Sequence, residues 1–240
     1  MDRPAALNAV DTRQAEAIAG TCDRLAADPT VRVVILASAV AKAFCVGADL
    51  KERNALSDDD LAVQRPVSRR AYNSVLELPM PTIAAVEGYA LGGGCELALS
   101  CDLIIASDSA VFALPEVGVG VIPGGGGTQL LSRRVGLNRA ADLIFTTRRV
   151  AADEACAIGL ADRRTTTGAA RQSARDLARQ IATKSPIALR NAKLALRSGF
   201  DLPLAQGLEV EDRAWRETAF SADRAEGVAA FVEKREPQWP

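Results

Sequence analysis

Apolar residues along the chain recur at two different spacings. Helical spacing predicts helices over residues 11–27 and 58–78, the second of which ends before two prolines. Continuous apolar runs rich in β-branched residues predict buried strands at 31–37, 82–86 and 103–106. Because strands, glycine-bearing turns and helices follow one another, the pattern indicates parallel strands joined by right-handed helical crossovers.

Downstream of the glycine run at residues 124–127 the spacing becomes mostly helical. Three short helices and one last short strand are predicted, at residues 128–135, 137–146, 151–158 and 162–165. From residue 168 onward the pattern is helical throughout. We therefore predict an α/β core over residues 1–184 and a helical C-terminal arm over residues 185–240.

Composition narrows the class of protein. The 240 residues are 48% hydrophobic and 25% charged, with a net charge of -1, as in a globular protein with a large core. Aromatic residues make up only 4%, so aliphatic side chains must fill that core. No basic block offers a nucleic-acid footprint, and no apolar run approaches the ~20 residues of a membrane span. We expect neither a nucleic-acid partner nor a membrane segment.

The numbers of cysteines and histidines limit the kinds of catalytic and metal sites that the chain can form. The 5 cysteines are odd in number and form no Cys-x-x-Cys pair, which favours free thiols in a reducing compartment. Histidine is absent, so a histidine-activated nucleophile and most zinc sites are excluded. The first residues lack the pattern of a signal peptide. These features together predict a cytoplasmic protein.

Two glycine-bearing turns lie between the predicted elements. One spans residues 44–50 and contains Gly47 and Ala48, and the other is the triple glycine at residues 92–94. Glycines at the start of a helix indicate either close packing or a set of N–H donors that favour negative charge. If the turns follow adjacent parallel strands, they meet at the carboxyl ends, where ligands bind in open α/β sheets.

Two glutamates lie in apolar surroundings close to these turns. Glu96 follows the triple glycine, and Glu116 follows Pro115. Each glutamate is either a functional group facing the core or part of a solvated surface, and its position alone does not decide. Two carboxyls near N–H donors would suit an enzyme that adds water or moves protons. The glycine run at 124–127 lacks the Gly-Lys-Ser/Thr ending of a phosphate loop.

Taken in order, these motifs resemble the crotonase family, the enoyl-CoA hydratase/isomerase superfamily. The resemblance covers almost the whole chain, with matching segments at residues 3–10, 44–52, 81–102, 114–129 and 220–235. It implies an α/β fold, a spiral core of ββα units with a helical C-terminal arm, assembled as a homo-oligomer, either a trimer or a hexamer that is a dimer of trimers.

One feature departs from the family pattern. Family members carry a longer segment before the Arg-Pro motif, and that segment forms a first β-hairpin. Here Arg3 and Pro4 stand almost at the start, so we expect the hairpin to be absent. Its loss would remove apolar burial and expose a neighbouring strand edge.

The resemblance also implies a ligand and a set of site residues. The ligand is an acyl-CoA thioester, whose carbonyl oxygen would accept hydrogen bonds from the N–H groups of Ala48 and Gly93, the oxyanion hole. Glu96 and Glu116 would be the catalytic residues. The implied substrate-binding positions are Ala5, Ala6, Leu7, Val46, Asp49, Leu50, Pro115 and Gly124.

Both acidic positions of the hydratase subgroup are filled, which favours an enoyl-CoA hydratase of fatty acid metabolism. Such a lyase adds water to a 2-enoyl-CoA and gives a 3-hydroxyacyl-CoA. We assign water activation to Glu96 and proton delivery at Cα to Glu116. The alternatives are an isomerase that uses Glu116 as a single shuttling base, and a non-catalytic acyl-CoA-binding paralogue. We expect no metal and no cofactor, because coenzyme A is part of the substrate.

Overall fold

The computed structural model describes all residues from 1 to 240, and its contacts divide the chain into two units. Unit 1 comprises Met1–Asp28, Ile35–Leu78 and Thr82–Leu177. Unit 2 comprises Pro29–Val34, Pro79–Pro81 and Ala178–Pro240. The predicted division at residue 184 stays a prediction. None of the helices combines the length and the apolar composition needed to cross a bilayer.

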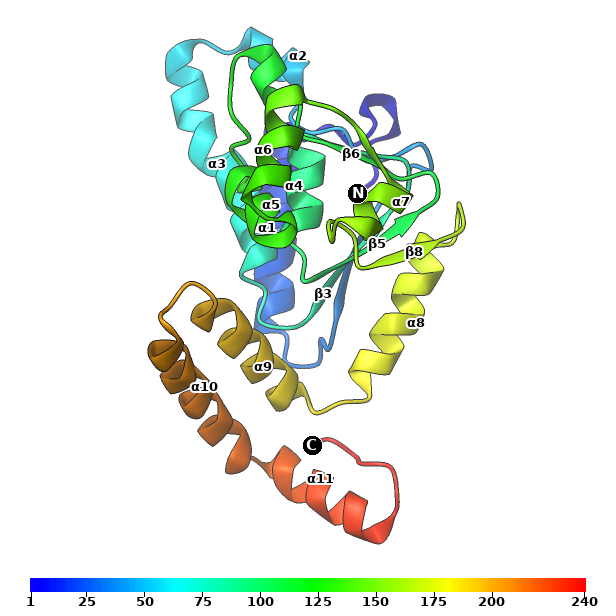
Figure 1. The fold of residues 1–240 in the computed structure, drawn as a ribbon, viewed down its shortest axis with the longest axis vertical. Coiled ribbons are helices and arrows are strands. Elements are labelled where there is room, and N and C mark those ends of the chain that lie inside the picture. The colour runs from blue at the N-terminus through cyan, green and yellow to red at the C-terminus, as the bar shows by residue number, and fades with distance from the viewer. The chain divides into compact units, whose positions relative to one another are not determined.

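Short strands and helices alternate through the first two thirds of the chain (Figure 1). In chain order they are η1 (Pro4–Ala6), α1 (Thr12–Ala27), β1 (Val34–Ala37), β2 (Ala43–Cys45), α2 (Leu50–Ala55), α3 (Asp58–Leu76), β3 (Thr82–Val86), β4 (Tyr89–Leu91), α4 (Gly93–Leu99), β5 (Leu103–Ser107), β6 (Val111–Ala113), η2 (Glu116–Val119), α5 (Gly127–Val135), α6 (Leu137–Thr146), β7 (Val150–Ala151), α7 (Ala152–Ala157) and β8 (Arg163–Thr165). The remaining elements are α8 (Ala170–Ala182), α9 (Pro186–Gly199), α10 (Leu204–Ala219) and α11 (Ala222–Glu233).

The strands form two sheets, and the chain visits them in turn. One sheet has the order β1-β3-β5-β8 and the other β2-β4-β6-β7. β3, β5 and β8 pair in parallel, as do β2, β4 and β6, whereas β7 pairs antiparallel to β6. The first three repeats therefore each place one strand in each sheet before a helix returns the chain, whereas α7 separates β7 of the second sheet from β8 of the first. This is the spiral of ββα units that the resemblance implies.

The predicted helices and the strands β3, β5 and β8 are confirmed with small changes in their bounds. Two predictions were wrong. The strand predicted at 31–37 begins only at Val34, and the loop predicted at 44–50 starts within β2 and ends in α2. The second sheet was missed, because its strands are only two or three residues long and show no alternation.

The core of unit 1 lies around the central strands of both sheets. β3 is buried along its whole length, and β5 is buried except at Leu103. Phe44 and Phe112 supply the largest fully buried side chains of the second sheet. Aliphatic side chains fill most of the remaining core, as the low aromatic content predicts, and this rigid frame holds the turns that follow β2 and β4.

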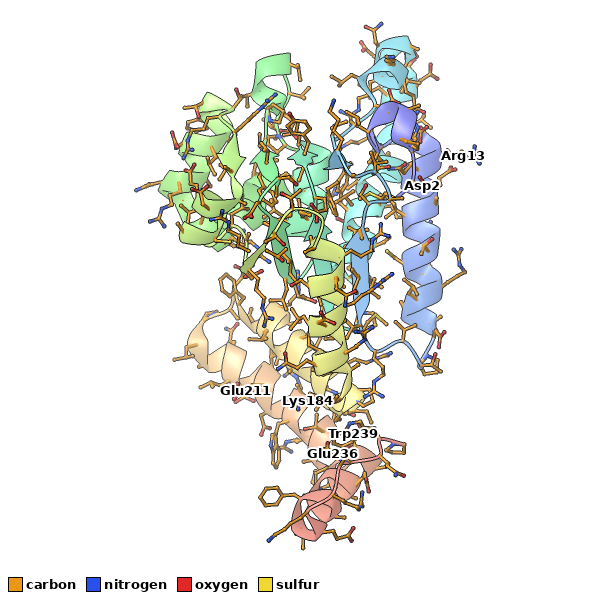
Figure 2. All side chains as sticks on the ribbon, turned by 90° about the vertical axis from the view of Figure 1, so that its right-hand side faces the viewer. Asp2, Arg13, Lys184, Glu211, Glu236 and Trp239 are labelled. Atoms are coloured by element: carbon orange, nitrogen blue, oxygen red, sulfur yellow. The ribbon has the colours of Figure 1, made fainter.

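Unit 2 is built around a pair of packed helices and a third helix linked to them. α9 and α10 approach closely where Gly199 faces Gly207, since a Cβ on Gly199 would lie 3.5 Å from the Gly207 Cα. The buried Asp223 of α11 accepts hydrogen bonds from Ser185 and Ile187 at the start of α9. The Trp239 indole, beside Lys184 in Figure 2, donates to the Thr183 carbonyl at 2.8 Å.

Candidate active site

Two turns meet at the carboxyl ends of neighbouring parallel strands. β2 pairs with β4, so the turn after Cys45 lies against the start of α4. A Cβ on Gly47 would lie 3.0 Å from the Gly93 nitrogen. The N–H groups of Ala48 and Gly93 donate to no acceptor in the chain. The turns were predicted to meet, and they do, although the strands that precede them belong to the sheet the pattern missed.

Each glycine of the triple glycine meets a separate close contact. Gly92 has a φ of 52°, and a Cβ there would lie 3.0 Å from Glu116 Oε1. A Cβ on Gly93 would lie 2.2 Å from the Tyr72 hydroxyl, and one on Gly94 only 1.9 Å from the Cys45 carbonyl oxygen. The triple glycine was expected to indicate either close packing or a set of N–H donors, and both occur in the same turn.

Glu96 is held by the glycine run after Pro123. Its side chain is buried, and Oε1 accepts hydrogen bonds from the N–H groups of Gly125 at 2.7 Å and Gly127 at 2.8 Å. A side chain on Gly125 or Gly127 would collide with the Glu96 carboxyl, because each Cβ would lie within 2.9 Å of one of its oxygens. The run thus serves as a cradle for a carboxylate and leaves Oε2 without a backbone partner.

Glu116 lies beside Gly92, and the hydrogen bonding of its carboxyl differs from that of Glu96. It is half-buried at the start of η2, and its Oε2 is an enclosed atom without a hydrogen-bond partner. Its Oε1 is the atom that approaches Gly92. A buried carboxyl oxygen without a donor favours the protonated form, because ionisation there is not compensated.

Burial raises the pKa of both carboxyls, but the groups that oppose or add to this rise differ between them. Burial raises the pKa of Glu96, and the hydrogen bonds from Gly127 and Gly125 oppose that rise. Burial raises the pKa of Glu116 to about 7, and the negative charge of Glu96 adds to the rise. Near neutral pH the pair therefore favours the proton on Glu116 and the charge on Glu96.

Three further side chains surround the pair, and the sequence pattern did not single them out. Arg65 donates to the Gly124 carbonyl at 2.6 Å, and the Arg53 guanidinium has no hydrogen-bond or ion-pair partner in the chain. Both guanidinium charges act on Glu96. Tyr72 packs its ring against Gly125 and its hydroxyl against Gly93. The only sequence signal for Tyr72 was its place among just 2 tyrosines.

The segment implied to lie along coenzyme A is tied to the Ala48 turn. Arg3, one residue before η1, forms ion pairs with Asp49 at 2.7 Å and Asp11 at 3.0 Å. A parallel bridge joins Val10 to Ala48. Asp49 also caps α2 by accepting from two backbone N–H groups, and its hydrogen bond with Arg3 lowers its pKa. The Asp49 carboxylate is therefore used within the chain, where it fixes the turn.

The remaining implied positions differ in accessibility. Leu50 and Pro115 are exposed, as is Ala5, whereas Val46 and Gly124 are half-buried. Ala6 and Leu7 are also half-buried, on the segment that Arg3 ties down. All of these residues belong to unit 1, together with both glutamates and both oxyanion-hole candidates.

Comparisons with known proteins identify the family. The model of the family described as "Enoyl-CoA hydratase/isomerase" matches residues 1–240. The chain is 43% identical over 237 residues to the probable mitochondrial enoyl-CoA hydratase 2 of Arabidopsis thaliana, covering 99% of this chain and 79% of that protein. It is 41% identical to the mitochondrial methylglutaconyl-CoA hydratase of Mus musculus, covering 97% of this chain and 75% of that protein.

A solved structure has the same fold. The enoyl-CoA hydratase of Bacillus anthracis superposes with a TM-score of 0.96 at 40% identity, over 99% of this chain and 92% of that one. The two-sheet spiral described above is therefore the crotonase fold. Fold, motif order and sequence identity agree over the whole length, and the chain belongs to the enoyl-CoA hydratase/isomerase family.

Proposed function

We propose that this protein is an enoyl-CoA hydratase that adds water to a 2-enoyl-CoA thioester and forms a 3-hydroxyacyl-CoA. The observation that carries the proposal is the unlike pair of carboxyls beside two free N–H groups. Glu96 is cradled by the N–H groups of Gly125 and Gly127, whereas Glu116 Oε2 has no donor. Hydration needs one base and one acid at the same pH, and this arrangement supplies both.

In the proposed reaction the thioester oxygen accepts hydrogen bonds from the Ala48 and Gly93 N–H groups. Glu96 Oε2 takes a proton from a water molecule as the water oxygen bonds to Cβ. The electron pair of the double bond moves toward the thioester oxygen, where the N–H donors stabilise the enolate. Glu116 then gives its proton to Cα, and transfer of the proton from Glu96 to the ionised Glu116, directly or through solvent, restores the starting state.

The reaction so drawn uses only groups of this chain and of the substrate. Carboxyls move the protons and backbone N–H groups hold the negative charge, so we propose that no metal or further cofactor takes part. None of the five cysteines forms a disulfide bond, which fits the reducing cytoplasm proposed as the location.

The test of this function is a product assay with paired substrates. A 2-enoyl-CoA should give the 3-hydroxyacyl-CoA, and a 3-enoyl-CoA should not be converted to its 2-isomer at a comparable rate. Isomerisation without hydration would instead favour a single shuttling base at Glu116. Binding of both thioesters without turnover would identify a non-catalytic acyl-CoA-binding protein.

A second candidate shares the chemistry but differs in the acyl group. The Arg53 guanidinium has no partner in the chain, and the Arg65 guanidinium bonds only a carbonyl oxygen, so neither is paired with a carboxylate. Unpaired cations near the site favour an acyl group that itself carries a carboxylate, as the name of the Mus musculus methylglutaconyl-CoA hydratase indicates for that relative. The assay therefore includes one neutral and one carboxylated 2-enoyl-CoA, compared by kcat/KM.

Activity should fall as the proton donor ionises. Because the pKa of Glu116 is raised to about 7, the protonated acid is present below that pH and is lost above it. We expect kcat/KM for hydration to decline as pH rises through neutrality. Steady-state rates across this range provide the measurement, and residual activity of Glu116→Gln should lack the decline. A rate that stays level or increases through neutral pH would assign the donor role elsewhere.

We also propose that the protein is a homo-oligomer, and we expect it to sediment as a trimer or a larger assembly. Unit 2 exposes large apolar side chains on α10 and α11, among them Leu204 at 79%, Phe231 at 85% and Val232 at 72%. Leu208 and Val228 are also exposed, and Ala205 lies on the same helix as Leu208. Monomers rarely leave such surface uncovered. Sedimentation velocity at micromolar concentration gives the measurement, and a single species of 25.3 kDa would exclude the assembly.

A further inference from the structure

Tyr72 lies where the two parts of the site meet. It belongs to the buried side of α3, together with Ser68, Ala71 and Val75, and is 5% exposed. Its ring atoms Cγ and Cδ1 lie 2.8 Å from the position a Cβ would take on Gly125, whose N–H holds Glu96. Its hydroxyl lies 2.2 Å from the corresponding position on Gly93. One side chain thus contacts both the glutamate cradle and the proposed oxyanion donor.

The Tyr72 hydroxyl has no hydrogen-bond partner within the chain. A buried phenol normally finds one, so an unpartnered hydroxyl in a side chain this deeply buried requires an explanation. The enclosed side-chain atoms without partners are Glu116 Oε2 and Arg32 Nε, and the Tyr72 oxygen is not among them. The hydroxyl oxygen therefore keeps some accessible surface. Because no group of the chain bonds this hydroxyl, a ligand atom that reaches it would be its hydrogen-bond partner.

The position of the hydroxyl follows from the geometry of α4. Along a helix each Cα–Cβ bond tilts toward the N-terminus, which is also the direction in which the first N–H groups point. The hydroxyl occupies the Cβ side of Gly93, the first residue of α4. The same Cβ position is 3.4 Å from the Gly47 Cα, next to Ala48. The hydroxyl therefore lies beside the turn that carries the Ala48 and Gly93 N–H groups.

We propose that the Tyr72 hydroxyl is a third hydrogen-bond donor to the thioester oxygen, beside the N–H groups of Ala48 and Gly93. This inference rests on the proposed function, because it assigns a role within the same reaction. A phenol is a stronger donor than a backbone amide, and its hydrogen bond strengthens as the thioester oxygen takes on enolate charge. The interaction is thus larger in the transition state than with the bound substrate, so it acts on kcat.

The state of the phenol fits this role. Burial raises the pKa of Tyr72, and the negative charge of Glu96 raises it further. Tyr72 therefore keeps its proton across the working range and acts as a donor, not as a base. Nearby Arg53 opposes the rise without outweighing it.

The test compares Tyr72→Phe with Tyr89→Phe. Tyr72→Phe removes an oxygen that bonds nothing in the chain, so the fold should be retained and Tm should change little. Tyr89 is the other tyrosine of the chain, packed under Arg149 and outside the site, and serves as the matched control. We expect Tyr72→Phe to lower kcat for hydration by about 10²-fold with a much smaller change in KM. We expect Tyr89→Phe to match the wild type.

A second measurement does not depend on turnover. Bound butyryl-CoA labelled with ¹³C at the thioester carbonyl reports hydrogen bonding through its infrared stretch, which moves to lower frequency with each donor. Tyr72→Phe should raise this frequency relative to the wild type and to Tyr89→Phe. Equal frequencies in wild type and Tyr72→Phe, or an unchanged kcat, would overturn the third donor. A frequency change in a protein that hydrates no 2-enoyl-CoA would refute the proposed function and leave the donor standing.

Discussion

Glu96→Gln and Glu116→Gln should each lower kcat for hydration by about 10²–10⁴-fold, the range for loss of one proton-transfer group. Glutamine keeps the volume of the side chain. In Glu96→Gln the amide oxygen still accepts from Gly125 and Gly127, so the cradle is preserved while the base is lost. In Glu116→Gln the acid is lost. The matched control is Glu77→Gln, because Glu77 is exposed at the C-terminal end of α3 and no hydrogen bond joins it to either carboxyl.

The double variant tests whether the two carboxyls act as a unit. If both protons move in one concerted addition, Glu96→Gln/Glu116→Gln should be little slower than the more damaged single variant. Glu116→Gln should also lose exchange of the Cα proton of a saturated acyl-CoA with deuterated solvent. Hydration at a near-normal rate by either single variant would remove that glutamate from the mechanism. Multiplying effects in the double variant would indicate two independent steps.

Three strands of the first sheet, β1, β3 and β5, were predictable from sequence because they are apolar runs between clear helices. β3 at Thr82–Val86 is bounded by prolines before and a glycine after, and it is buried throughout. The second sheet was not predictable. Tyr89–Leu91 and Val111–Ala113 are three residues each, too short for any period to emerge. Their existence depends on pairing with strands that are distant in sequence, and no local preference encodes that pairing.

The candidate active site was also only partly predictable from the sequence. Residue types and turns indicated acid–base chemistry near N–H donors, and the resemblance supplied the positions. What holds Glu96 in place comes from Gly125 and Gly127, about 30 residues downstream, which only the folded chain brings within reach. The roles assigned to Glu96 as base and Glu116 as acid require the proton to be on Glu116, and the residues alone contained no physical reason for that difference. That difference depends on which one has backbone donors, a property of three-dimensional packing.

Tyr72 shows a further limit of pattern analysis. Within the helix predicted at 58–78 it is one more residue of the buried side, and a buried tyrosine is usually a core residue. Only the missing hydrogen-bond partner and the contact with Gly93 mark it as different. The triple glycine carries the complementary signal, because Gly93 has no room for a side chain where the Tyr72 hydroxyl lies.

Removing the Gly93 N–H should lower kcat by about 10²–10³-fold while coenzyme A binding is largely kept. Proline is the substitution that deletes this donor, and the helix tolerates it because Gly93 is the first residue of α4. The ring would however place a Cβ 2.2 Å from the Tyr72 hydroxyl. Gly93→Pro alone therefore combines loss of the donor with a collision.

Substituting Gly93 by proline and, separately, by alanine in a Tyr72→Phe background separates loss of the N–H donor from the collision. Without the hydroxyl, the nearest Tyr72 atom to the new Cβ is Cζ at 3.2 Å, a contact that a small shift relieves. Gly93→Ala in this background adds the same Cβ and keeps the N–H, so it is the matched control for Gly93→Pro. We expect the proline variant to have a kcat about 10²–10³-fold below that of the alanine variant. Calorimetric titration with free coenzyme A, which lacks the thioester oxygen, should give similar Kd values for both. Equal kcat values in the two folded variants would show that the Gly93 N–H does not bind the developing enolate.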